Sequence, residues 1–356
     1  MDNAGCPGTA DRMTRLRDLA AAVSTRVETV ALLYGGTSGE REVSLASGSG
    51  VREVLEKEGF SVLSIDTGEA GFVDTLLAGR PDVAFVALHG KGGEDGCIQG
   101  LLETLGIPYT HSGVEASALA MDKRVSKLLY QAGGLLTARF AVASRDEFGD
   151  VADTDDGRAF VMHGSDKVAA GIDALVASIG LPCVVKPLSD GSSLGVSIPK
   201  TRDGFVQALD TGFRVGDTLL VEEFVAGIEV TVPVLGNGRH DLLALPVIEI
   251  VPKNEFYDYE SKYAEGGSEH VIPARIDERE TAACKQAAIE AHAALGCAGV
   301  SRTDMIVTKA GVPCLIETNT VPGMTRTSLI PEDAKKAGIT PGELYRLLLH
   351  FALERR

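Results

Sequence analysis

The sequence predicts two kinds of fold in one chain: an open α/β layer built on a parallel sheet, followed by an α+β part. In the first third, apolar runs without polar interruptions alternate with amphipathic segments, which is typical of a parallel sheet buried on both faces. Later strand-like runs follow one another across short turns, which indicates antiparallel hairpins. The length of 356 residues fits two or three domains.

The α/β layer begins with a continuous apolar strand from Thr29 to Tyr34. Helices are then predicted at about 40–58, 72–77 and 97–105, and strands at 61–65 and 83–88. The loops at 35–39 and 89–96 follow strand ends, where open α/β sheets bind ligands. Glycines that only turn the chain explain the first loop equally well, whereas the second also holds His89, Lys91, Glu94 and Asp95. Neither loop contains the G-x-G-x-x-G fingerprint of dinucleotide sites.

The α+β part begins with a predicted helix from Met121 to Gly133. Residues 146–167 are polar and rich in Asp and Gly, so they are expected to form a surface insertion. Beyond it, the apolar pattern predicts helices at 172–179 and 278–295 and strands at 183–187, 195–198, 219–225, 229–234 and 242–250. Ala226-Gly227 is expected to join two of these strands.

Composition excludes several classes of function. The net charge of −16 argues against a nucleic-acid partner. Six scattered cysteines without a C-x-x-C pair indicate neither zinc nor a disulfide framework, so a reducing compartment is expected. Residues 1–26 carry charges and lack an apolar core, so they are expected to be neither a signal peptide nor a membrane anchor. No other run is long enough to span a bilayer.

The most informative segments are Arg302-Thr303-Asp304 and Glu317-Thr318-Asn319, separated by a predicted hairpin. If the turn is centred between Ala310 and Gly311, the numbers of facing residues add to 621. Asp304 then faces Glu317, Arg302 faces Asn319, and all four share one face. Two carboxylates and an amide oxygen suit Mg²⁺, with an arginine beside them for an oxyanion. A charge pair on a solvated sheet face explains the residues equally well.

Three further segments have both a functional and a purely structural interpretation. The Ser189–Gly195 loop, preceded by Lys186-Pro187, suits a phosphate but also suits a flexible hairpin loop. Glu222-Glu223 at a strand end suits adenine and ribose, although charges that protect a sheet edge are common. The tyrosine-rich segment 254–263 resembles a mobile lid, and a loop held by its own aromatic residues is the alternative.

In combination, these segments resemble the D-alanine–D-alanine ligases of the ATP-grasp superfamily, from about Val30 to Leu349. The matching motifs are Gly35–Ser44, His89–Gly96, Met121-Asp122-Lys123, Lys186-Pro187 with Gly191-Ser192-Ser193, Tyr257–Tyr263 and Glu317–Thr325. The resemblance implies a two-lobed ATP-grasp fold after the open-sheet domain. The implied division is an extension at 1–26, a donor-substrate domain at 27–111, a central lobe at 112–221 with the insertion near 146–167, and a C-terminal lobe at 222–356.

The resemblance also implies an activity. ATP would phosphorylate the carboxylate of one D-alanine, and the amine of a second would attack the acylphosphate, giving D-alanyl-D-alanine for peptidoglycan in the cytoplasm. Lys-Tyr at 262–263 is similar to the dipeptide-forming members. The alternatives are a ligase that uses D-lactate or D-serine as acceptor and an inactive nucleotide-binding relative. A homodimer is implied because the family is commonly dimeric, and no membrane or nucleic-acid partner is expected.

Individual roles follow from the same resemblance. Nucleotide contacts are implied for Lys123, Lys186, Lys262, Glu222, Val225 and Glu229. Two Mg²⁺ or Mn²⁺ ions would bind Asp304, Glu317 and Asn319. Arg302 and the Gly323 N–H would form the oxyanion hole, and Glu40, Ser192 and Tyr263 would link three domains. The donor D-alanine would meet Glu40, with His89 and Glu94 shaping its pocket, and the acceptor would meet Lys262, Ser328 and Leu329.

Overall fold

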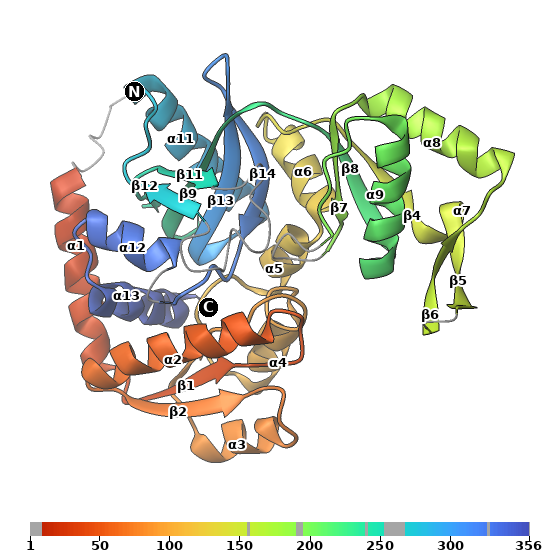
Figure 1. Ribbon diagram of the computed structural model, residues 1–356. Helices are drawn as coiled ribbons and strands as arrows, with labels where there is room; N and C mark the ends of the chain where they lie inside the picture. The colour runs from red at the N-terminus through yellow and green to blue at the C-terminus, as the bar shows by residue number, and fades with distance from the viewer. Residues whose placement is uncertain are drawn as a thin grey trace.

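The computed structural model describes residues 9–154, 157–189, 195–238, 241–252, 268–325 and 328–355. Three sheets with their helices build the body of the molecule (Figure 1). A large sheet lies in the centre, the N-terminal sheet lies below it in this view, and a small sheet lies to the right.

The N-terminal sheet has the predicted open parallel form. Its strands β1 (Thr29–Tyr34), β2 (Ser61–Asp66) and β3 (Val83–Val86) run parallel in the order β2-β1-β3. The three predicted helices are present as α2 (Arg41–Lys57), α3 (Phe72–Gly79) and α4 (Cys97–Leu105). Residues 30–33 of the central strand are buried, which explains their uninterrupted apolar sequence.

The small sheet is antiparallel, in the order β4 (Phe140–Ser144), β8 (Thr218–Glu223) and β7 (Cys183–Pro187). Helices α8 (Asp166–Ile179) and α9 (Arg202–Val215) pack against it through buried aliphatic and phenylalanine side chains. The strand predicted at 195–198 is reduced to a single bridge between Val185 and Ser197. Strand β8 continues to Glu223, so residue 221, after which the lobe boundary was expected, lies inside this strand.

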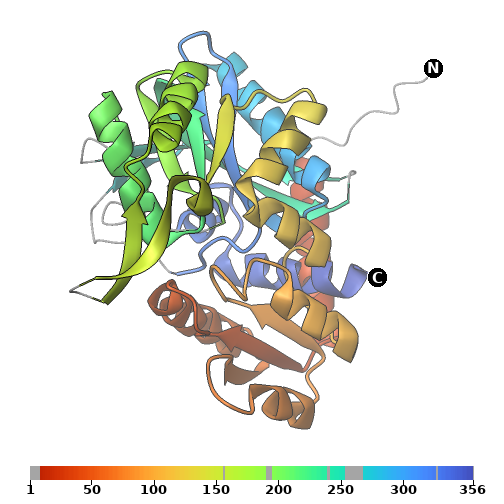
Figure 2. The same ribbon diagram turned by 90° about the vertical axis from the view of Figure 1, so that its right-hand side faces the viewer.

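The insertion expected as a polar surface loop is a folded element. Helix α7 (Arg145–Phe148) leads into an antiparallel hairpin of β5 (Gly149–Thr154) and β6 (Gly157–Met162). Figure 2 shows this hairpin projecting at the left edge of the molecule. The rings of Phe148 and Phe160 are buried, with centroids 5.8 and 5.1 Å from that of Phe213 on α9. Aromatic burial therefore anchors the base of a segment whose average composition is polar.

The large sheet has the order β12 (Ser268–Val271), β11 (Ile248–Pro252), β9 (Gly227–Asn237), β13 (Ala298–Thr308) and β14 (Pro313–Asn319), with β10 (Leu243–Ala244) paired to β9. The helix predicted at 278–295 is present as α11 (Glu278–Leu295), and it packs against this sheet. Two predictions were wrong here. The strands before and after Ala226 belong to different sheets, and the strand expected at 242–250 divides into β10 and β11.

The helix predicted from about Met121 to Gly133 is present as α6 (Lys123–Ala132), and a separate helix that was not predicted, α5 (Val114–Met121), comes directly before it. Asp122 between them has extended backbone dihedrals, and its carboxylate accepts hydrogen bonds from the N–H groups of Arg124 and Val125. An aspartate in this position satisfies free N–H groups at the start of a helix, so it begins a new helix instead of continuing the old one.

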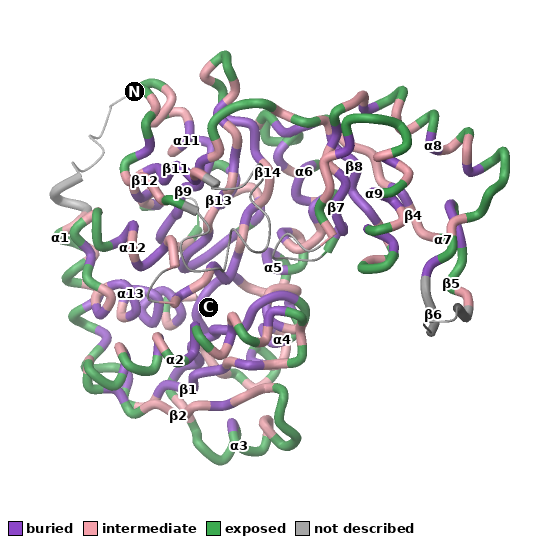
Figure 3. Tube along the Cα trace, in the orientation of Figure 1, coloured by how far each residue is buried: buried purple, intermediate pink, exposed green. Residues whose placement is uncertain are grey.

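The N-terminal extension forms helix α1 (Thr9–Ala22) and the turn η1 (Val23–Thr25), which lie beside the C-terminal helix α13 (Pro341–Glu354) (Figure 1). Ala20 and Val23 are buried in a core that also contains side chains of β1, β13, α13 and the preceding helix α12 (Leu329–Lys336). In Figure 3, much of α13 and of β1 is purple, which marks the buried residues of this core. Within the described part of the chain, the helices are too short or too polar to cross a bilayer.

Candidate active site

The hairpin of β13 and β14 has the predicted pairing at the end away from its turn. Arg302 faces Asn319 and Asp304 faces Glu317, so the four side chains share one face. The other neighbour of β13 is β9, where Thr231 stands opposite Asp304. Arg302 and Asp304 therefore lie on an inner strand of the large sheet, whereas Glu317 and Asn319 lie on its last strand.

Asp304 is held by hydrogen bonds from three side chains on this face. Arg302 binds it with Nε and a terminal nitrogen, at 2.9 and 2.8 Å. The Thr231 hydroxyl donates to Asp304 at 2.5 Å, and the Asn319 amide donates at 3.2 Å. Arg302 and Asp304 have side chains only 16% and 14% exposed, so their attraction is weakly screened.

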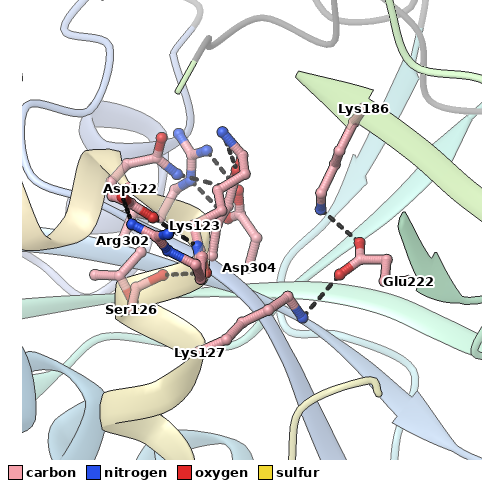
Figure 4. A network of polar contacts seen from close by, with 12 residues as sticks. Asp122, Lys123, Ser126, Lys127, Lys186, Glu222, Arg302 and Asp304 are labelled. Atoms are coloured by element: carbon pink, nitrogen blue, oxygen red, sulfur yellow. Dashed lines mark hydrogen bonds and ion pairs between the residues drawn. The ribbon is translucent and has the colours of Figure 1, made fainter. Parts of the chain in front are cut away.

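Helix α6 brings a lysine to the second carboxylate. The Nζ atom of Lys123, the first residue of α6, lies 3.4 Å from Glu317 Oε2. The backbone N–H of Lys123 donates to the carbonyl of Leu188, just beyond β7, at 3.4 Å. The cap at Asp122 therefore places Lys123 between the large sheet and the small sheet, as Figure 4 shows.

A second cluster joins the small sheet to α6. The carboxylate of Glu222 on β8 lies between two lysines, with Lys186 Nζ 2.5 Å from Oε1 and Lys127 Nζ 2.8 Å from Oε2 (Figure 4). All three residues are buried. Burial acts to raise the pKa of Glu222, but the charges of Lys186 and Lys127 outweigh it and lower that pKa. Burial likewise acts to lower the pKa of Lys186, and the charges of Glu222, Glu317 and Asp304 raise it.

The link between the two sheets follows directly after this cluster. Val225 lies in the connecting residues 224–226, and Glu229 lies on β9 opposite Ile306. A Cβ atom on Gly227 would lie 2.1 Å from the carbonyl oxygen of Val307, so the chain enters β9 in close contact with β13. The residues proposed for adenine and ribose thus lie along one short crossing between the sheets.

The two N-terminal loops place three predicted residues together. A Cβ atom on Gly90 would lie 2.6 Å from Glu40 Oε2, so the Glu40 carboxylate rests against the second loop. The Gly90 N–H donates to Glu94 at 2.9 Å, and Ser47 of α2 lies 3.0 Å from His89 Nε2. A cavity of about 220 Å³ lies between the two loops and is lined by residues including Ser38 and His89.

Electrostatics links these loops to the C-terminal part. Burial and then the charge of Glu40 raise the pKa of Glu94 to about 8, against opposing contributions from hydrogen bonds and Arg302. Burial lowers the pKa of His89 to about 4, and the nearby Arg302 also lowers it. The backbone of Val321 also acts on both groups, raising the pKa of His89 and lowering the pKa of Glu94. The hairpin and the N-terminal domain therefore converge on one region.

The segment after β14 closes the site on another side. Ser328 is the residue before the first turn of α12, and its side chain makes no capping hydrogen bond; its Oγ instead accepts from the Thr325 N–H at 2.9 Å and lies 2.7 Å from the Thr325 hydroxyl. A Cβ atom on Gly323 would lie 2.9 Å from Ser328 Oγ, which places the Gly323 backbone close to that hydroxyl. Leu329 is the first residue of α12. Ser192, Lys262 and Tyr263 lie outside the described residues.

The donor set on the hairpin fits a hard divalent cation. Carboxylate oxygens of Asp304 and Glu317 and the amide oxygen of Asn319 are the ligand types that Mg²⁺ prefers. The described residues contain no group of three or more His, Cys, Asp or Glu side chains suited to a metal, so the asparagine is needed to complete this set. Arg302 and Lys123 stand beside the two carboxylates and pair with them in this structure.

Lys127 and Thr231 belong to the site but were not predicted from the sequence. Lys127 lies one helical turn after Lys123, and Tyr130 follows three residues later, so all three occupy one face of α6. That spacing was visible in the sequence and would have predicted a second inward lysine. Thr231 gave no such signal, because its position opposite Asp304 depends on how β9 pairs with β13.

The chain matches two protein-family models. The model described as D-ala D-ala ligase C-terminus matches residues 159–350, and the one described as D-ala D-ala ligase N-terminus matches residues 69–112. The first match alone spans more than half of the chain and includes both β13 and β14.

Individual relatives agree with the family models. A D-alanine–D-alanine ligase of Halalkalibacterium halodurans is 45% identical over 327 residues, which are 92% of this chain and 99% of the relative. The crystal structure of the Bacillus anthracis D-alanine–D-alanine ligase matches with a TM-score of 0.75 and 31% identity, over 92% of this chain and 98% of that one. Its structure complexed with ATP matches over the same shares, with a TM-score of 0.73 and 28% identity.

A third relative is named for a different acceptor. The VanG D-Ala:D-Ser ligase of Enterococcus faecalis matches with a TM-score of 0.73 and 28% identity, over 92% of this chain and 99% of that one. The fold is therefore common to ligases with different acceptors.

Proposed function

The chain belongs to the D-alanine–D-alanine ligase family, and from this premise we infer that it uses ATP to join two D-alanine molecules for cell wall synthesis. Its fold is the ATP-grasp fold of these ligases. The observation that carries the proposal is the shared face of Arg302, Asp304, Glu317 and Asn319, with Lys123 beside it. Such a face suits phosphoryl transfer, which depends on positioning and on neutralising phosphate charge.

The proposed reaction has two steps. In the first, a carboxylate oxygen of the donor D-alanine attacks the γ-phosphorus of ATP, ADP leaves, and an acylphosphate forms. In the second, the amine of the acceptor attacks the acyl carbon, phosphate leaves, and the nitrogen loses a proton. Lys123 and Lys186 would bind nucleotide phosphates, since both are buried cations close to the carboxylates of the hairpin.

Asp304, Glu317 and Asn319 would hold two Mg²⁺ or Mn²⁺ ions. Bound metal would neutralise charge on the phosphate oxygens during transfer. Arg302 would then give up part of its contact with Asp304 and donate a hydrogen bond to the oxygen of the tetrahedral intermediate. The Gly323 N–H would donate to the same oxygen. Removal of one donor of this kind typically lowers the rate about 10²–10³-fold.

The adenine would bind at the crossing between the sheets. Glu222 and the Val225 backbone would contact the base, and Glu229 the ribose. This assignment is supported by their consecutive positions at the end of β8, in the link and at the start of β9.

The two amino acids would enter from opposite sides. Glu40 would bind the ammonium group of the donor, with His89 and Glu94 shaping its pocket, which is supported by the position of these residues against the second loop. Ser328 and Leu329 at the start of α12 would receive the acceptor together with Lys262. Ser192 and Tyr263 would complete a closed lid with Glu40 and exclude water from the acylphosphate.

The oligomeric state and the cellular location are proposed from the resemblance to the family alone. We propose a homodimer, which light scattering after size-exclusion chromatography would test. A cytoplasmic location, where ATP is available, completes the proposal.

Phosphate release tests the function directly. We expect release that requires ATP, Mg²⁺ and D-alanine and that L-alanine does not support. Product analysis with D-alanine, D-serine and D-lactate in competition tests the acceptor, because the likeness to a D-Ala:D-Ser ligase makes D-serine the second candidate. Predominant D-alanyl-D-alanine is expected. A purified, folded preparation that binds ATP but releases no phosphate with any of these would contradict the proposal.

A further inference from the structure

Lys127 is a buried cation with no role in the reaction described above. Its side chain is 0% exposed, and Nζ contacts Glu222 Oε2 at 2.8 Å and the Thr137 hydroxyl at 2.6 Å. The same Nζ lies 5.8 Å from the centre of the Phe140 ring. A buried ammonium group is costly unless it is paired, so the close partners of Lys127 explain how it is retained.

The charges of this cluster do not cancel. Glu222 provides one negative charge, and Lys127 and Lys186 each provide a positive charge, so the cluster carries a net charge of +1. Without Lys127, the carboxylate of Glu222 would be paired to Lys186 alone. Lys186 would then be compensated within the protein and less available to an anionic ligand.

Lys127 also links three elements, through its ion pair with Glu222 and a hydrogen bond to Thr137. It donates to Thr137, and the Thr137 hydroxyl in turn donates to the Leu315 carbonyl of β14 at 2.8 Å. Because the Thr137 hydroxyl has one hydrogen, donation to Leu315 leaves its lone pairs for Lys127. Lys127 therefore pairs helix α6 with strand β8 through Glu222 (Figure 4), and it reaches strand β14 only through Thr137.

We propose that Lys127 is a positioning residue for ATP: it holds one oxygen of Glu222 and compensates part of its charge, so that Glu222 does not fully offset the charge with which Lys186 attracts phosphate. Glu222 is turned by this contact so that its two oxygens face two different lysines. The inference rests on the proposed function, because it assigns Lys127 to the nucleotide site through Lys186 and Glu222.

The test is a double-mutant cycle between Lys127 and Glu222. We expect Lys127→Met to weaken binding of ADP and of a non-hydrolysable ATP analogue by roughly 10- to 100-fold, the range of a lost hydrogen bond to a charged group. The KM for ATP should rise similarly, with little change in the KM for D-alanine. In a Glu222→Gln background, where there is no carboxylate to compensate, the same substitution should change binding by less than about 3-fold.

A packing role predicts a different pattern. It would give the same loss in both backgrounds, or would change both KM values, kcat and thermal stability together, and either result would overturn the inference. Lys57→Met, at an exposed lysine of α2, is the matched control and should leave binding unchanged. If Lys127→Met does not fold, Lys127→Gln keeps a donor without the charge and is measured in the same cycle.

Binding measured without D-alanine separates this inference from the proposed activity. If the wild type binds ATP and the cycle shows coupling, but D-alanine causes no phosphate release, the activity fails and the role of Lys127 stands. If phosphate release is normal and the cycle shows no coupling, the proposed activity stands and the proposed role of Lys127 fails.

Discussion

Asp304 and Glu317 lie directly opposite each other, although the pairing nearer the turn is one residue out of step. Asp304 to Glu317 and Arg302 to Asn319 each add to 621, whereas Met305 to Leu315 and Val307 to Pro313 each add to 620. Ile316 is the extra residue between these two registers. If the register at the turn continued unchanged, Asp304 would face Ile316 and Glu317 would point to the other face.

A β-bulge therefore sets the candidate metal face. Bulges insert one unpaired residue, and they occur preferentially where a side chain must be directed next to an active site. The bulge also explains why a register counted from the turn is right at 302–304 and wrong at 305–307. The pairing predicted from the sequence adds to 621, whereas the pairing next to the turn adds to 620. Because the bulge adds one residue to β14, the pairing beyond it adds to 621, and the prediction is right at Arg302 and Asp304.

Glu317→Gln should raise the Mg²⁺ requirement and lower kcat. The substitution keeps the size of the side chain but removes the charge that balances the proposed metal, so we expect kcat to fall about 10²-fold or more. The measurement is phosphate release over a Mg²⁺ titration at saturating substrates. Glu290→Gln, at an exposed position of α11, is the control. An unchanged Mg²⁺ titration would remove Glu317 from the metal site.

The fold was most predictable where one local signal decides an element. The boundaries of β1, α4, β7 and α11 agree with the sequence patterns, because uninterrupted or periodic burial and flanking glycines set them. The predictions failed where distant partners decide. The strands on either side of Ala226 lie close in sequence but pair in separate sheets, which depends on contacts with β7 and β13.

The candidate site shows the same division. Strand alternation placed Arg302 and Asp304 together, and helical spacing could have added Lys127. Thr231 and the contact of Gly90 with Glu40 join separate parts of the fold, and no local pattern carries that information.

Asp333→Asn should change stability in a pH-dependent way. Asp333 is 0% exposed, and both carboxylate oxygens lack a hydrogen-bond partner among the described residues. Burial raises its pKa from 3.8 to about 8; nearby Lys285 opposes this shift and Glu332 adds to it. The folded state thus binds a proton that the unfolded state releases, so the wild type loses stability as the pH rises from about 4 to 8.

Thermal unfolding of both proteins at several pH values measures this effect. We expect the melting temperature of the variant, relative to that of the wild type, to rise by about 2 °C or more between pH 5 and pH 8. Above pH 8 we expect no further change in this difference. Because the gain is taken between two pH values, a constant offset between the two proteins cancels. A difference in melting temperature that stays constant with pH would show that Asp333 is ionised throughout.

Val23→Ala should destabilise the protein without affecting catalysis at 25 °C. Val23 is 0% exposed and packs in the core shared by α1, α13 and the N-terminal sheet. Loss of its methyl groups should cost about 1–2 kcal/mol of unfolding free energy, measured by denaturant titration. Ala22→Ser changes an exposed neighbour and should be close to neutral. Equal stability of the Val23 variant and the wild type would mean that the N-terminal extension is not docked in solution.

Gly90→Ala should weaken binding of the donor D-alanine. Gly90 has a φ of +68°, and its added Cβ would lie 2.6 Å from Glu40 Oε2, so the carboxylate must move. We expect the KM for the donor to rise roughly tenfold, a loss of about 1.4 kcal/mol of binding, with the KM for ATP unchanged. Gly59 is the matched control, since its φ is +90° and a Cβ added there would have no atom within 4 Å. Gly59→Ala has the same backbone strain of about 1–2 kcal/mol without the clash. Equal effects of the two substitutions on the donor KM would attribute the loss to strain and not to Glu40.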